Sequence, residues 1–103
     1  MTYKVIVTER AEEQLNTIIR YILVQFNNKD AAGSVLSDVL KTYDKLEYIV
    51  GSAQLCNDPY LAAKGYYRIS LEKHNYLLLY RIHGDEVIVN GIFHMLENYQ
   101  DKL

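Results

Sequence analysis

The C-terminal third of the chain contains three apolar stretches of strand length that follow one another closely. They cover residues 65–71, 76–82 and 87–94, and they are rich in tyrosine, leucine, isoleucine and valine. Short polar connections separate them, so they are predicted to be consecutive antiparallel strands. Two arginines and two histidines lie within or beside these strands, and burying an unpaired charge is costly. We therefore expect these side chains on a sheet surface that is open to a ligand or a partner.

The alternation of side chains along the strands predicts which residues share a face. If Gly84 and Asp85 form a two-residue turn with glycine at its first central position, counting back along both strands places Asn75 opposite His94. The apolar face would then hold Tyr67, Ile69, Leu71, Tyr76, Leu78, Tyr80, Ile82, Val87, Val89 and Phe93. The mixed face would hold Tyr66, Arg68, Ser70, Glu72, Asn75, Leu77, Leu79, Arg81, His83, Ile88, Asn90, Ile92 and His94. A mixed face of this kind is typical of a binding or catalytic groove.

Two amphipathic helices are predicted before these strands. The first begins after Thr8, a good N-cap residue, and its apolar positions run from Ala11 to Phe26 at spacings of three and four. The second stripe runs from Ala32 to Leu46. Only a few residues connect the helices, so they are expected to lie antiparallel, with their apolar stripes covered by a sheet.

The order of these elements predicts the fold class. Residues 1–7 alternate like a strand, which gives the order β-α-α-β-β-β. We expect an α+β fold in which the helix hairpin packs on one face of a mainly antiparallel four-stranded sheet. Residues 51–64 are predicted to be a loop, and residues 95–103 a short closing helix that brings Tyr99 near the sheet edge. The length of 103 residues predicts a single domain over residues 1–103.

Composition excludes several classes of function. The net charge is −2, from 11 basic and 13 acidic residues, and no basic arm indicates nucleic-acid binding. No apolar run is long enough to cross a bilayer and the first residues do not resemble a secretory signal, so a soluble, cytoplasmic protein is expected. The single cysteine, Cys56, agrees with a reducing compartment. No residue cluster has metal-ligand spacing and no glycine-rich phosphate loop is present, so neither a metal nor a cofactor is expected.

Three short segments, in this order and spacing, carry a likeness to a known family. Gly65-Tyr66-Tyr67-Arg68 opens one strand, Tyr80-Arg81-Ile82 ends the next, and Ile92-Phe93-His94 is followed by Tyr99 five residues later. Together with the helix hairpin, this arrangement resembles the RelE/ParE superfamily of type II toxins over essentially the whole length. The resemblance implies a growth-inhibiting toxin of a toxin-antitoxin system.

The resemblance also implies roles for four residues. RelE-like and YoeB-like members cut messenger RNA in the ribosomal A site, a reaction that needs an acid, a base and cations around the phosphate. By this resemblance Arg68 would clamp the phosphate and Arg81 would add positive charge. His94 would serve as acid or base, and Tyr99 would stack on an RNA base. Ribosome-dependent mRNA cleavage is the first function that the sequence predicts, with Arg68, Arg81, His94 and Tyr99 as catalytic residues.

Two alternatives remain open at this point. Met95 and Leu96 stand where many RNA-cutting members carry arginines, and the mildly acidic chain has weak attraction for ribosomal RNA. ParE-like members poison DNA gyrase without a demonstrated hydrolytic step, and they often carry a histidine followed by nonbasic residues here. The first alternative is therefore a non-enzymatic gyrase poison. The second is a detoxified relative that is retained as an antitoxin-binding module.

A small antitoxin is the partner that the resemblance implies, because antitoxins of this superfamily wrap the toxin with an amphipathic segment. It could cover the helix-hairpin surface or the mixed face, in a heterotetramer with the toxin or beside a toxin homodimer. On the mixed face it would cover an otherwise exposed apolar patch of Leu77, Leu79, Ile88 and Ile92.

Overall fold

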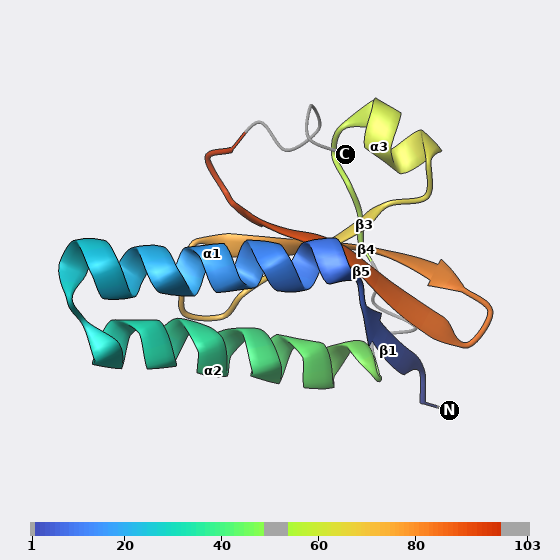
Figure 1. The fold of residues 1–103 in the computed structure, drawn as a ribbon. Coiled ribbons are helices and arrows are strands. Elements are labelled where there is room, and N and C mark those ends of the chain that lie inside the picture. The colour runs from blue at the N-terminus through green and yellow to red at the C-terminus, as the bar shows by residue number, and fades with distance from the viewer. Residues whose placement is uncertain (1, 49–53, 98–103) are drawn as a thin grey trace.

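The computed structural model describes residues 2–48 and 54–97, and it confirms the expected α+β class. Figure 1 shows the two long helices side by side as one layer along the sheet, with a short third helix beyond the other side of the sheet. The elements are β1 (Lys4–Val7), α1 (Glu9–Phe26), α2 (Lys29–Leu46), β2 (Gln54–Leu55), α3 (Pro59–Ala63), β3 (Tyr67–Ser70), β4 (Tyr76–His83) and β5 (Glu86–His94).

The helix hairpin forms as the sequence predicts. The Thr8 side chain accepts a hydrogen bond of 3.2 Å from the backbone N–H of Ala11, which caps α1. Asn27 ends α1 in the left-handed region at φ 47°, a conformation that asparagine tolerates better than most residues. Asn28 then caps α2 by accepting from Ala31 N–H at 3.0 Å. Two adjacent asparagines thus end one helix and begin the next, which holds the two helices antiparallel.

The sheet has five strands in the order β1-β5-β4-β3-β2, one strand more than the sequence predicts. β1 runs parallel to β5, and the other neighbouring pairs are antiparallel. The additional strand, β2, is only two residues long, and two residues cannot show a period in the sequence. It lies in the segment predicted to be a loop, which also contains α3. The Asp58 carboxylate caps α3 by accepting from Tyr60 N–H at 2.9 Å and Leu61 N–H at 3.1 Å.

The β4–β5 hairpin begins in the predicted register. Gly84 has φ 61° and His83 lies opposite Glu86, as expected for a two-residue turn with glycine first. The register then shifts between Leu79 and Tyr80. Tyr80 lies opposite Val89, whereas Leu79 lies opposite Gly91, so Asn90 is an extra residue in β5. This extra residue is a β-bulge.

The bulge reverses the predicted faces beyond it. His94 lies opposite Tyr76 and not opposite Asn75, so that prediction was wrong. Because one extra residue moves all later side chains of the strand to the other face, Ile92 lies on the helix side and Phe93 on the opposite side. His94 follows by alternation and lies on the helix side.

The inner core lies between the helix layer and the sheet. It contains Ala11, Val35, Val39, Leu46, Leu71, Leu78, Tyr80, Val87, Val89 and Ile92. A second cluster, the outer core, lies on the other face of the sheet and contains Cys56, Leu61, Tyr66, Leu77, Leu79 and Phe93. The residues predicted as an exposed patch are therefore covered in part by the chain itself, because Leu77 and Leu79 are buried by the segment around α3 and Ile92 by the helices.

A buried carboxylate ties the β3–β4 connection to α2. Asp38 is 3% exposed, and its Oδ2 accepts hydrogen bonds of 3.0 Å from the backbone N–H groups of both Lys73 and His74. Two donors satisfy a charge that would be costly to bury alone. In the same connection the His74 Nε2 lies 3.0 Å from the hydroxyl of Ser34. These contacts fix the end of the sheet against the helix layer.

The described part of the chain contains no helix that is long and apolar enough to span a membrane.

Tyr80 gives the inner core a pH-dependent element. Its ring is fully buried and stacks on Tyr67 with the centroids 5.6 Å apart. Its hydroxyl has no hydrogen-bond partner among the described residues. Burial, with smaller contributions from Tyr67 and Cys56, raises the pKa of Tyr80 to about 12. The folded chain therefore resists ionisation of this phenol more strongly than the unfolded chain does.

We predict that Tyr80→Phe makes the protein less sensitive to alkali. Between pH 10 and 12 the unfolded state loses the Tyr80 proton first, so the wild-type free energy of unfolding should fall by about 2–3 kcal/mol from this group alone. Urea unfolding at several pH values should show this component missing in Tyr80→Phe. The variant should also be at least as stable at pH 7, because it removes an unpaired buried hydroxyl. The control Tyr48→Phe, at an exposed tyrosine, should keep the wild-type pH dependence, and an equally steep loss in Tyr80→Phe would contradict the prediction.

Candidate functional site

Arg68 and Arg81 share the outer face of the sheet, on neighbouring strands. Arg68 on β3 lies opposite Leu79 on β4, and Arg81 lies two residues beyond Leu79. The Arg81 guanidinium carbon is 4.5 Å from the centroid of the Tyr66 ring, a cation–π contact. The register thus brings together the two arginines that the sequence analysis singles out.

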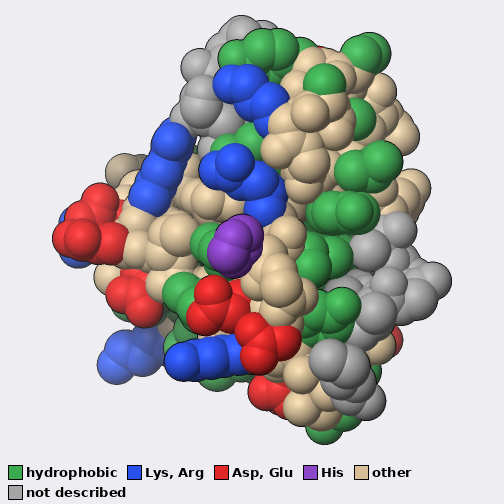
Figure 2. All heavy atoms as spheres, turned by 90° about the vertical axis from the view of Figure 1, so that its right-hand side faces the viewer, with side chains coloured by type: hydrophobic (Ala, Val, Ile, Leu, Met, Phe, Trp, Pro, Cys, Tyr) green, Lys and Arg blue, Asp and Glu red, His purple; other side chains and the backbone are tan. Residues whose placement is uncertain are grey.

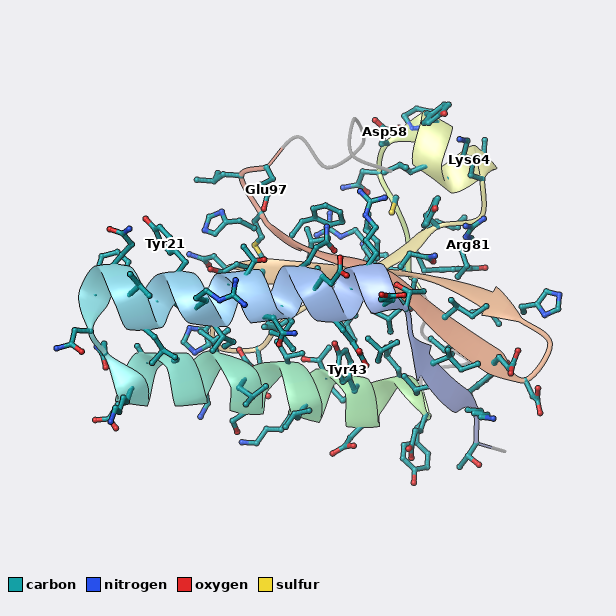
Figure 3. All side chains as sticks on the ribbon, viewed as in Figure 1. Tyr21, Tyr43, Asp58, Lys64, Arg81 and Glu97 are labelled. Carbon is teal, nitrogen blue, oxygen red and sulfur yellow. The ribbon has the colours of Figure 1, made fainter. Side chains whose placement is uncertain are left out.

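A second cation–aromatic pair extends this surface. Lys64, just after α3, places its Nζ 4.3 Å from the centroid of the Tyr60 ring. We call Tyr60, Lys64, Tyr66, Arg68 and Arg81 the outer cationic patch. Figure 3 shows Lys64 and Arg81 near the same end of the molecule. In the view toward that end in Figure 2, several Lys and Arg side chains gather above a histidine, whereas acidic side chains, with further basic ones among them, lie below it. A patch of this kind suits an acidic or phosphate-bearing partner.

Arg68 also borders the outer core. Burial raises the pKa of the Cys56 thiol, the positive charge of Arg68 opposes this effect, and Asp58 adds to it. The Cys56 backbone N–H donates to the Tyr66 carbonyl at 3.1 Å, which anchors the segment before α3 to the start of β3. Cys56 is therefore a buried packing residue beside a half-buried arginine.

His94 lies away from both arginines. Its ring makes an edge contact with Tyr76, with the centroids 5.3 Å apart, on the helix side of the sheet. His94 Nδ1 accepts from the Leu96 N–H at 3.1 Å, so the proton of the neutral ring lies on Nε2. Burial raises the pKa of Tyr76, and the nearby Glu97 and Tyr21 raise it further. The surroundings of His94 are thus aromatic and acidic.

The separation along the sheet is also large. His94 lies opposite Tyr76, and Arg81 is five positions farther along β4, which corresponds to roughly 17 Å at about 3.3 Å per residue. Figure 3 shows Arg81 and Glu97 toward opposite ends of the sheet. The expectation that His94 shares the mixed face with Arg68 and Arg81 was wrong, because the bulge at Asn90 turns it over. Tyr99 lies outside the described residues.

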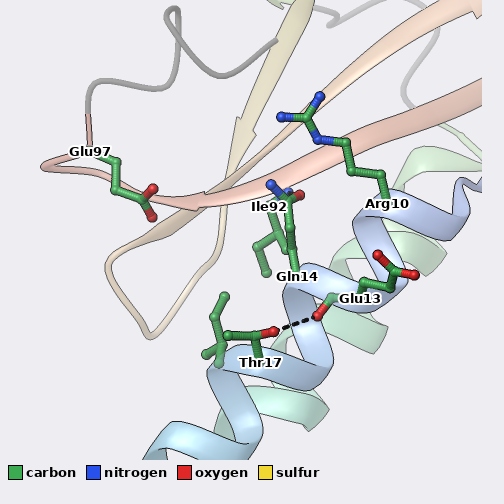
Figure 4. A pocket seen from close by; sticks show the side chains of 7 residues that line it. Arg10, Glu13, Gln14, Thr17, Ile92 and Glu97 are labelled. Atoms are coloured by element: carbon green, nitrogen blue, oxygen red, sulfur yellow. Dashed lines mark hydrogen bonds between the residues drawn. The ribbon is translucent and has the colours of Figure 1, made fainter.

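A pocket that the sequence analysis did not predict lies between α1 and the end of β5. Its volume is about 330 Å³, and the side chains around it are Arg10, Glu13, Gln14, Thr17, Ile18, Ile92 and Glu97. Figure 4 shows Gln14 reaching from α1 toward the strand, with Arg10 and Glu13 on the same helix and Glu97 across the opening. The Gln14 Oε1 accepts a hydrogen bond of 3.0 Å from the Ile92 N–H. The sequence contains one pattern that could have indicated the irregular strand beside this pocket. It is the Asn90-Gly91 pair inside a strand, which is typical of a bulge.

The described residues contain no group of three or more His, Cys, Asp or Glu side chains that could hold a metal ion. The chemistry that they offer is cationic binding on the outer face and mixed polar binding beside β5.

Comparisons with known proteins agree with this architecture. A family model described as the ParE toxin of the type II toxin-antitoxin system parDE matches residues 5–99. The chromosomal ParDE system of Pseudomonas aeruginosa contains a chain with a TM-score of 0.72 and 17% identity, over 89% of this chain and 95% of that one. A chain of the RelBE2 toxin-antitoxin complex of Mycobacterium tuberculosis has a TM-score of 0.57 and 16% identity, over 94% and 95%. No curated protein sequence matches the chain. At these identities the solved structures show a shared fold.

Gly91 tests the packing that accompanies the bulge. A Cβ at this position would lie 2.6 Å from Cε2 of Phe93 and 3.0 Å from Gln14 Oε1. Since Phe93 is enclosed in the outer core, we expect Gly91→Ala to lower the free energy of unfolding by about 1–3 kcal/mol in urea titrations. Gly33→Ala is the control, because its Cβ would meet nothing within 4 Å in α2. It should stabilise the chain by about 0.5–1 kcal/mol. Equal stabilities of the two variants would show that the strand adapts freely here.

Proposed function

Because the chain belongs to the ParE toxin family of type II toxin-antitoxin systems, we propose that it stops growth by binding DNA gyrase, without cleaving RNA. The observation that carries this proposal is the separation of His94 from Arg68 and Arg81. The two arginines lie on the outer face, and His94 lies on the helix side beyond a bulge.

Cleavage of RNA requires an acid or base within hydrogen-bond reach of the same phosphate that the cations hold. Arg68 lies opposite Leu79, which in turn lies opposite Gly91, so His94 is three residues farther along β5 and on the other face. The sheet itself lies between the two groups. This arrangement supports binding over acid–base catalysis.

The outer cationic patch supplies the binding surface in this proposal. Arg81 is exposed and stacks on Tyr66, and Lys64 is exposed and lies over Tyr60. Stacking on an aromatic ring limits the motion of each cation, so less side-chain entropy is lost when a partner binds. We assign Arg81 and Arg68 as residues that contact gyrase or the DNA that gyrase holds.

An antitoxin is the second partner that we propose. The two similar structures come from toxin-antitoxin systems, and the match to a toxin family model covers residues 5–99. Large apolar side chains at the end of α1 remain exposed, among them Val24 at 71% and Phe26 at 65%. Such a patch on a small chain is typical of a protein-binding surface.

Ribosome-dependent mRNA cleavage, the first prediction from the sequence, is the second candidate. The adjacent placement of Arg68 and Arg81 on one face favours it, because two neighbouring guanidinium groups suit a phosphate. The catalytic roles of His94 and Tyr99 stay predictions of that mechanism.

Purified toxin tested against purified gyrase separates these candidates. We expect inhibition of DNA supercoiling by the wild type, and inhibition weakened by at least about tenfold in Arg81→Ala, which corresponds to about 1.4 kcal/mol of binding free energy. Arg20→Ala, at an exposed arginine of α1, is the matched control and should inhibit like the wild type. His94→Ala should also retain inhibition, because this residue is outside the proposed contact surface.

A parallel assay with programmed ribosomes tests the second candidate, mRNA cleavage. Codon-dependent mRNA cleavage that Arg68→Ala or His94→Ala abolishes would replace gyrase binding with the RNA-cutting mechanism. No effect in either assay and no growth arrest on induction would instead favour an inactive antitoxin-binding module.

A further inference from the structure

Strand β5 is paired on both sides over only half of its length. β1 pairs with residues Glu86–Val89, whereas residues 91–94 pair with β4 on one side and with no other described strand on the other. The bulge at Asn90 marks the boundary between the two halves. An open strand edge presents unpaired N–H and C=O groups, and proteins usually cover or block it. We call residues 90–94 the open half-edge of β5.

Side chains occupy the hydrogen-bonding positions of this half-edge. The Ile92 N–H donates to Gln14 Oε1 at 3.0 Å, and the His94 N–H donates to Glu97 Oε1 at 3.0 Å. Ile92 and His94 are two residues apart, so their N–H groups point the same way, away from β4. The two side-chain oxygens stand where two carbonyl oxygens of a neighbouring strand would stand.

The space beside the half-edge can admit another segment. The pocket of about 330 Å³ lies here, between α1 and the end of β5, and falls within the range of ligand pockets. Figure 4 shows Gln14 and Glu97 reaching into this space from the helix and from the chain after β5. Both are side chains on flexible stems, so a competing acceptor can displace them without moving the backbone.

We propose that an extended segment of the antitoxin pairs with the open half-edge of β5. Its backbone carbonyls replace Gln14 Oε1 and Glu97 Oε1 as acceptors for Ile92 and His94. This inference rests on the proposed toxin function only in taking the antitoxin as the partner. A row of backbone donors and acceptors at strand spacing is complementary to another polypeptide backbone, which identifies the occupant as a peptide strand.

Side chains around the half-edge describe the sequence that this strand should carry. Two carboxylates, Glu13 and Glu97, and one guanidinium, Arg10, border the pocket. A lysine or arginine of the segment would be attracted to the two carboxylates. Beyond the strand end Met95 and Leu96 are exposed, at 38% and 90%, and would pack against an apolar residue of the segment. The expected segment is therefore short and extended, with one basic and one apolar side chain.

Amide hydrogen exchange of Gln14→Ala tests the replacement directly. In the free toxin, loss of the Gln14 acceptor should speed exchange of the Ile92 amide by about tenfold or more. In the complex with its cognate antitoxin, exchange should return to the rate of the wild-type complex, because a partner carbonyl now accepts the bond. Gln14→Glu keeps an acceptor and should retain slow exchange in both states.

Two further variants guard against a folding artefact. Glu97→Ala should show the same pattern at the His94 amide, free and bound. Asp58→Ala removes a similar acceptor from the Tyr60 amide at the start of α3, which lies on the outer side of the sheet, away from both the half-edge and the end of α1. Its fast exchange should persist in the complex, which shows that complex formation does not slow every amide.

The outcomes separate this inference from the proposed function. If the complex forms while the Ile92 amide of Gln14→Ala stays fast, the inference is overturned and the toxin proposal stands. Failure of the toxin to bind its antitoxin would overturn the partnership and the inference together. Protection of Ile92 that rises with the concentration of toxin alone would identify a second copy of this chain as the occupant, and it too would overturn the inference.

Discussion

The single extra residue in β5 is the constraint on which the rest of the structure depends. Before Asn90, β5 lies between β1 and β4 and contributes Val87 and Val89 to the inner core. After it, Ile92 still faces the helices, although a regular strand would have turned it to the other side. Phe93 consequently faces outward and fills the outer core beneath α3. The extra residue thus places Ile92 in the inner core and Phe93 in the outer core, where a regular strand would have exchanged them.

The same bulge determines which of the predicted functional side chains share a face of the sheet. It leaves two cations together on the outer face and moves the only histidine at the end of β5 into an aromatic and acidic environment. A reaction that transfers protons needs its acid, base and cations around one phosphate. Binding needs only a surface of suitable charge and shape, which the outer cationic patch provides.

The sequence predicted those elements of the fold that show a periodic apolar pattern, a helix-capping residue or a characteristic turn residue. The two helices, their asparagine connection, the Gly84 turn and the register near it follow from local rules, and the structure confirms them. The predicted faces beyond Asn90 were wrong, because a bulge depends on packing against α1 and not on alternation along one strand. Arg68 and Arg81 were placed together correctly, since no irregularity separates them. Gln14 was missed, because a side chain that bonds a strand edge 78 residues away leaves no local pattern.

Gln14 also occupies the part of the strand edge at which we propose that a partner binds. An unpaired strand edge invites pairing with any exposed strand, so an edge that is to accept one particular partner has to be blocked reversibly. A covering strand of its own would block it permanently, whereas the Gln14 amide and the Glu97 carboxylate each satisfy one N–H and can still be displaced. The net stability of such a hydrogen bond is about 0.5–1.5 kcal/mol for the amide and about 1.5–3 kcal/mol for the carboxylate, which pairing of several backbone groups and burial of apolar side chains can offset. The half-edge is therefore protected against weak encounters and remains available to a segment that matches it over several residues.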